Sequence, residues 1–128
     1  VVRPGGRVGV IVRGVDLHQW WNLPVSDAVR AKISLPAASV APGGVATAAL
    51  YGLAIAAGLT PDRMHTFTVA SELSEGPIVE YPETHALSQL NAAEQAEYRQ
   101  AKSAAVAEGS WFMTRGHHCF VGQVPGEA

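Results

Sequence analysis

The sequence predicts an α/β fold, on three observations. The run RVGVIVR at 7–13 is rich in β-branched residues and follows a turn containing Gly5 and Gly6, which is typical of a largely buried strand. The segment 64–73 has the composition of a second strand, and the alanine-rich segment 92–108 that of a long helix. The chain has 128 residues, within the usual size of one domain.

The opening strand is expected to lead into a short helix at about 27–34. Ser26 has the side chain of a good N-cap, and Val29 and Ile33 share one helical face. Pro36 ends the helix.

A loop at 35–44 and a second helix at about 44–57 should follow. Small residues and prolines fill the loop, and Gly58 stands where a left-handed helix cap is expected. The residues expected on the core face of this helix are Leu50, Leu53, Ala54 and Ala57.

The last helix and the last strand carry the clearest local signals. Asn91 and Glu94 have the spacing of a capping box at the start of the helix 92–108, and Gly109 ends it. A final strand is expected at about 110–123.

Composition excludes several classes of protein. Nine basic and eleven acidic residues give a net charge of −2, which argues against electrostatic binding to nucleic acid or to an anionic membrane. Cys119 is the only cysteine, so no internal disulfide can form, and a reducing cytoplasm is the expected location. The sequence has no run of about eighteen apolar residues that would predict a membrane span.

Three segments of the chain carry a family resemblance. They are VVRPGGRVGVIVR at 1–13, LYGLAIAAGLT at 50–60 and EGSWFMTRGHHCFVGQVP at 108–125. In that order they resemble the turn into the fifth strand, the helix before the sixth strand and the last strand of class I S-adenosylmethionine-dependent methyltransferases. The three matches occur in the family's order and span nearly the whole chain.

The resemblance implies that residues 1–128 are a partial methyltransferase domain, the C-terminal portion of a Rossmann-like sheet. About three strands are expected, in a mixed sheet with flanking helices, and the last strand should run antiparallel between 7–13 and 64–73. The family binds S-adenosyl-L-methionine through segments that precede R-P-G-G, and the chain contains no G-x-G-x-x-G. We therefore expect the chain to begin within the fold, to lack the cofactor-binding N-terminal half and to be inactive alone.

A partial sheet of this kind should leave one strand edge without a partner. The edge of 7–13 that would face the family's fourth strand is expected to be unpaired, which makes the isolated chain marginally stable and prone to aggregate.

The stretch GVDLHQWWN after the first strand holds the candidate substrate-binding residues. Ligands of open α/β sheets bind beyond the carboxyl ends of the strands. Asp16 could accept hydrogen bonds, His18 could accept a proton, and Trp20 and Trp21 offer flat surfaces for a small-molecule methyl acceptor or for the methylsulfonium. The alternative interpretation is that at least one tryptophan anchors the core or a lid and that His18 is merely solvated.

Other side chains suggest chemistry less strongly. His117 and Cys119 could converge on one strand face, but a structural zinc site needs four ligands, and neither His65 nor His85 has partner spacing. Gly43 and Gly44 could bind an anion through their backbone N–H groups at the start of a helix. The simpler explanation of the two glycines is that they let the loop turn.

Two other classes of function stay open beside methyl transfer. The chain could be a non-catalytic α/β module that completes or regulates a partner by adding its bare strand edge to another sheet. It could also be a small hydrolase or metal enzyme, but the sequence offers no convincing set of nucleophile, base and orienting group.

Overall fold

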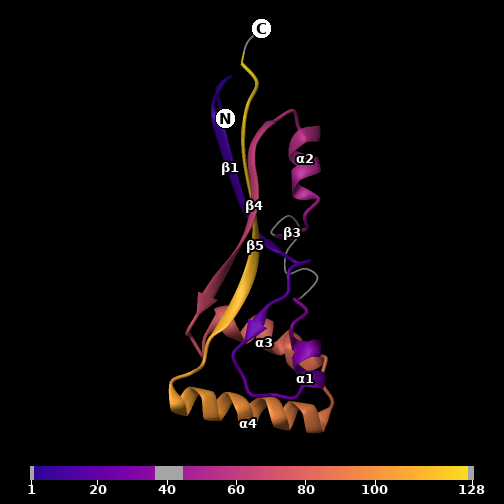
Figure 1. Cartoon of the computed structure of the whole chain (residues 1–128), viewed down its shortest axis with the longest axis vertical. Coiled ribbons are helices and arrows are strands. Elements are labelled where there is room, and N and C mark those ends of the chain that lie inside the picture. Colours follow the sequence, from indigo (N-terminus) through magenta and orange to yellow (C-terminus); the bar gives the residue numbers. More distant parts are fainter. Residues whose placement is uncertain (1, 37–44, 127–128) are drawn as a thin grey trace. The chain divides into compact units, whose positions relative to one another are not determined.

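A computed structural model describes residues 2–36 and 45–126 (Figure 1). Over these residues it contains four helices and five strands, which confirms the α/β class. The sheet has more than the expected three or so strands, because two short strands of two residues each, 20–21 and 45–46, join it. The chain divides into two compact units: unit 1 comprises residues within 1–16, 39–68 and 116–128, and unit 2 comprises residues within 17–38 and 69–115.

Unit 1 is built on the strands β1 (Arg7–Gly14), β4 (Thr60–Ser71) and β5 (Met113–Gln123) (Figure 1). The ends of β4 and β5 beyond Thr68 and before Gly116 belong to unit 2. β5 pairs with β4 and runs antiparallel to β1, so the last strand lies between the other two, as expected. The expected antiparallel direction of the last strand relative to the first is therefore confirmed.

The register of β1 against β5 extends from Arg7 opposite Gln123 to Arg13 opposite His117. A two-residue strand, β3 (Val45–Ala46), pairs in parallel with the end of β1 and makes the sheet mixed.

The other edge of β1 is largely bare. Within the described ranges, residues 7–12 have a strand partner only on the β5 side. Ile11 is 64% exposed, and Val8, Val10 and Val12 are only partly buried. The expected unpaired edge is present, and the β-branched run is less buried than its composition predicts because too few elements of the chain cover it.

The helix α2 (Leu50–Ala56) is shorter than the predicted 44–57. The helix cannot begin at 44, because Val45 and Ala46 pair with β1 as the strand β3. Of the residues expected in the core, Ala54 is buried, whereas Leu53 is 65% exposed and Ala57 is also exposed, which corrects the prediction for these two. Gly58 follows the helix with a φ of +86°, and the left-handed cap is confirmed.

Unit 2 contains the helices α1 (Asp27–Ile33), α3 (Pro77–Ser88) and α4 (Ala92–Glu108) and the strand β2 (Trp20–Trp21). The helices bury one continuous apolar cluster against the end of β5. Its members are Trp21, Leu23, Val29, Ile33, Val79, Ala86, Leu90, Tyr98, Ala101, Ala105, Trp111 and Met113.

Two helices of unit 2 agree with the sequence. The Ser26 hydroxyl accepts from Val29 N at 3.4 Å and caps α1. Asn91 and Glu94 exchange both bonds of the capping box at 2.9 Å, and Gly109 ends α4 with a φ of +73°.

Two elements of unit 2 were not predicted. The helix α3 carries Pro77 in its first turn and Pro82 inside, where a proline removes a backbone donor and usually breaks a helix. The strand β2 has only two residues, and it exists because Trp20 and Trp21 pair with Thr114 and Met113 of β5.

Candidate functional site

Asp16 follows the carboxyl end of β1 and belongs to unit 1. Its Oδ1 lies 2.6 Å from Nε2 of His118, and its Oδ2 accepts the backbone N–H of Ala48 at 2.9 Å. Desolvation opposes ionisation, but the hydrogen bonds from His118 and Ala48 outweigh it and hold the pKa of Asp16 below its usual value. The ionised carboxylate thus joins β5 to the residues just before α2.

His118 lies on β5, and its side chain is only 3% exposed. Because an ionised carboxylate can only accept, Nε2 of His118 carries the proton shared with Asp16. The other ring nitrogen, Nδ1, is buried and has no hydrogen-bond partner among the described residues. Both oxygens of Asp16 are occupied by groups of the chain itself, and substrate binding by Asp16 stays a prediction.

The two tryptophans of β2 point to opposite sides, as neighbours on a strand must. Trp21 is 1% exposed and donates its Nε1–H to Ile33 O at 2.8 Å. Its ring packs edge-on against the ring of Tyr98, with the two ring centres 5.9 Å apart. Trp20 is 47% exposed. The interpretation that one tryptophan anchors the core is therefore confirmed for Trp21, and Trp20 is available for a ligand.

His18, Trp20 and Trp21 line one hollow of unit 2 with a volume of about 410 Å³, within the size range of small-molecule sites. Residues of α1 and its C-cap also line the hollow, which we name the α1 groove. Asp27, Arg30 and Ser34, spaced by three and four residues, lie on one helical face. Three of the four predicted residues thus gather at one hollow, while Asp16 lies in unit 1.

Arg30 is a charged group of the α1 groove that is held by several contacts. Its guanidinium carbon lies 4.5 Å from the centre of the Trp20 ring, within the range of a cation–π contact. Its Nη2 donates to Leu23 O at 2.7 Å and its Nη1 to Trp21 O at 3.5 Å. Arg30 was not among the residues predicted from the sequence, although its spacing from Asp27 and Ser34 on the predicted helix is a signal that could have found it.

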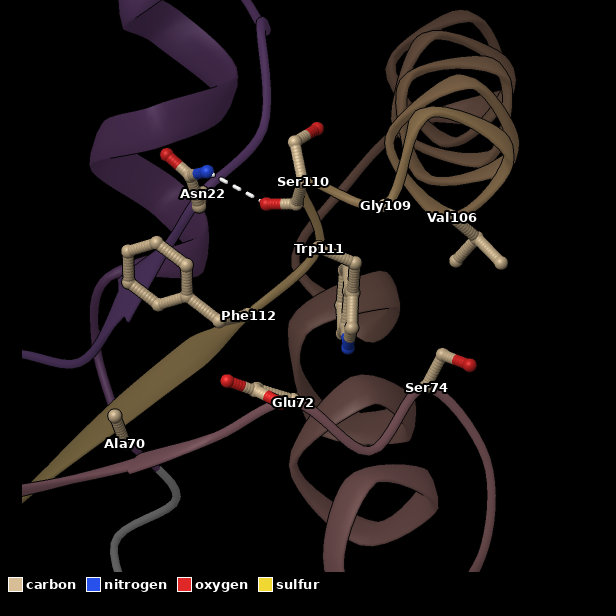
Figure 2. A pocket seen from close by; sticks show the side chains of 9 residues that line it. All are labelled: Asn22, Ala70, Glu72, Ser74, Val106, Gly109, Ser110, Trp111 and Phe112. Atoms are coloured by element: carbon tan, nitrogen blue, oxygen red, sulfur yellow. Dashed lines mark hydrogen bonds between the residues drawn. The ribbon is translucent and has the colours of Figure 1, made fainter.

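A second and larger hollow of unit 2, about 700 Å³, lies beside the C-terminus of α4 (Figure 2). Two of its polar donors are already used: Asn22 Nδ2 donates to Ser110 O at 2.7 Å and Trp111 Nε1 donates to Leu73 O at 2.9 Å. Among the residues that line this hollow, the charged side chain is that of Glu72, which is exposed. The α1 groove is the better candidate site, because it combines an exposed indole with a guanidinium that is held in place.

The weaker candidates fall in different places. His117 stacks on Phe67 with ring centres 5.3 Å apart, and Cys119 is buried. In residues 2–36 and 45–126 no three His, Cys, Asp or Glu side chains come close enough to hold a metal ion. The glycine pair at 43–44 lies outside the described residues.

Comparison with known proteins gives no match to any family model, to any curated protein or to any solved structure. Over the described ranges, no helix has the length and apolar character needed to cross a membrane.

Proposed function

We propose that the chain is the C-terminal part of an S-adenosylmethionine-dependent methyltransferase that acts on a small-molecule acceptor. The observation that carries the proposal is the strand order of unit 1, in which the antiparallel β5 lies between β1 and β4. The same order was expected from the resemblance of the segments 1–13, 50–60 and 108–125. The bare edge of β1 supports the proposal further, because residues 7–12 have no second strand partner among the described residues and could pair with a further parallel strand.

The α1 groove is the candidate acceptor site because of its place in the sequence. The segment that forms the groove follows the carboxyl end of β1, and ligands of α/β sheets bind beyond such ends. We therefore assign the α1 groove to the acceptor. The methyl group would move from the sulfonium sulfur to the acceptor's nucleophilic atom, the sulfur would leave as a thioether, and the chain's contribution would be positioning.

The bare edge of β1 also favours a second function. A non-catalytic module could add β1 to the sheet of a partner protein, where main-chain hydrogen bonds supply the affinity. This function needs no cofactor.

The experiment that separates the two functions begins with the coding sequence upstream of Val1. Methyl transfer predicts a strand and a G-x-G-like turn roughly a hundred residues earlier, a separation typical of one α/β domain. The extended protein should bind S-adenosylmethionine in calorimetry, and the 128-residue chain should not. Binding of the cofactor by the short chain at micromolar concentration would overturn the assignment to a C-terminal part. An upstream sequence without such a turn would favour the module.

A further inference from the structure

We propose that the α1 groove binds an aromatic monocarboxylate, with the ring against Trp20 and the carboxylate on Arg30. The inference rests on the proposed function only for the ligand's role as methyl acceptor. Binding itself is a property of unit 2 and can be measured without any methyl transfer.

Trp20 supplies the aromatic wall. Its pairing with Thr114 turns the indole away from the core that holds Trp21, and the residue is 47% exposed and lines the groove. Exposed indoles with a polar neighbour recur at ligand sites, because the flat ring gives a large contact area at low entropic cost. A planar aromatic ring is the ligand shape that uses this surface best.

Arg30 supplies the charge that selects an anion. A guanidinium has five N–H donors, and the two bonds to Leu23 O and Trp21 O leave three of them without a protein partner. No carboxylate of the described residues forms an ion pair with Arg30. A carboxylate suits the remaining N–H donors, since hydrogen bonds from a guanidinium to a carboxylate are charge-assisted.

The position of Arg30 is fixed before any ligand arrives. The bond to Leu23 O and the ring of Trp20 hold the guanidinium from two sides, so little side-chain freedom remains to be lost on binding. The same contact places the cation and the aromatic wall next to each other. In an aromatic acid the ring and the carboxylate are likewise neighbours, so one ligand can contact both Trp20 and Arg30.

Asp27 limits the ligand to a single negative charge. It lines the same groove three residues before Arg30, which is about 4.5 Å along the helix axis. A second anionic group of a ligand would face this carboxylate, whereas a hydroxyl could donate to it. The groove therefore favours an aromatic monocarboxylate over a dicarboxylate or a phosphate ester.

The test is calorimetry of the 128-residue chain with benzoate, trans-cinnamate, their methyl esters and benzylamine as probes. We expect the acids to bind about tenfold or more tightly than the esters, which is the usual effect of one charge-assisted bond. The indole N–H signal of Trp20, assigned through Trp20→Leu, should shift with the acids. Equal affinity for acids and esters, or tighter binding of benzylamine, would overturn the proposal.

Three variants sharpen the test. Arg30→Gln should abolish the preference for acids, and Arg30→Lys should keep only part of it because the forked geometry is lost. Asp27→Asn, the matched control on the same helix face, should tighten acid binding severalfold by removing a repulsive charge. An unchanged preference in Arg30→Gln, or weaker acid binding in Asp27→Asn, would contradict the assignment.

The indole signal of Trp111 should stay in place in each variant and serves as the check on folding. If Arg30→Gln does not fold, the ester comparison and Asp27→Asn still decide the proposal. The outcome is separable from methyl transfer: acid binding without cofactor binding by the extended protein would leave the groove assigned and remove the proposed function.

Discussion

The hydroxyl of Tyr98 donates to the carboxylate of Glu83 at 2.9 Å, and the same carboxylate oxygen lies 2.6 Å from Lys102 Nζ. Tyr98 is fully buried against Trp21, so this bond satisfies the polar end of an otherwise apolar core residue. Burial, together with the charge of Glu83, raises the pKa of the Tyr98 hydroxyl above its ordinary value.

Replacement of Tyr98 by Phe should lower the free energy of unfolding by about 1.5 kcal/mol, the low end for a bond to a charged acceptor, because Lys102 still pairs with Glu83. Urea unfolding followed by tryptophan fluorescence measures the change. Tyr51→Phe is the matched control, since Tyr51 is exposed and its ring contact with Phe120 survives the substitution. Equal losses in the two variants would contradict the expectation.

Removal of Asp16 should loosen the start of α2. Asp16→Ala deletes the acceptor of Ala48 N–H and leaves Nε2 of the buried His118 without a partner. An unsatisfied buried group costs about 1–3 kcal/mol. Amide hydrogen exchange should show faster exchange at Ala48, and Asp62→Ala, which removes a surface ion pair with Arg7, should leave Ala48 unchanged. Unaltered exchange at Ala48 in Asp16→Ala would show that the carboxylate does not hold this segment.

Acid should reproduce the effect of Asp16→Ala in the unmodified chain. The pKa of Asp16 is lower in the folded state than its ordinary value of 3.8, so the stabilisation is complete above that value and is lost as the pH falls through the folded pKa. Hydrogen exchange at Ala48 should therefore gain an additional acceleration below about pH 4 that Asp16→Ala lacks. The difference between the two proteins across an acid titration isolates the carboxylate from other groups.

The elements that the sequence predicted well are those whose signals are local. The capping bonds of Asn91, Glu94 and Gly109 lie within their own helix, and the predicted bounds of α4 are the observed ones. The strand 7–13 was similarly evident from its β-branched run. Local composition fixed these segments without reference to their neighbours.

The missed features depend on contacts between distant segments. The helix α3 contains Pro82, which disfavours a helix. The helix forms nevertheless, because Val79 and Ala86 pack into the core of unit 2. The two-residue strand β2 needs Thr114, nearly a hundred residues away. The residues of the candidate site differ in the same respect. His18 and Trp20 could be selected from the sequence because they follow a predicted strand. The role of Arg30 could not, because it depends on contacts with the carbonyl of Leu23 and the Trp20 ring.

The bare edge of β1 predicts that the chain by itself associates with other copies. Ile11 is 64% exposed on a strand whose second edge has no partner over residues 7–12 of the described chain, and such edges template intermolecular pairing. Ile11→Lys should therefore reduce association in sedimentation velocity, since an edge lysine opposes strand pairing. Its effect on the free energy of unfolding should stay within about 0.5 kcal/mol, as for other exposed positions. Leu53→Lys is the matched control, because Leu53 is 65% exposed on α2 and away from the strand edge. If both lysines reduce association equally, general surface hydrophobicity drives it and the edge of β1 does not.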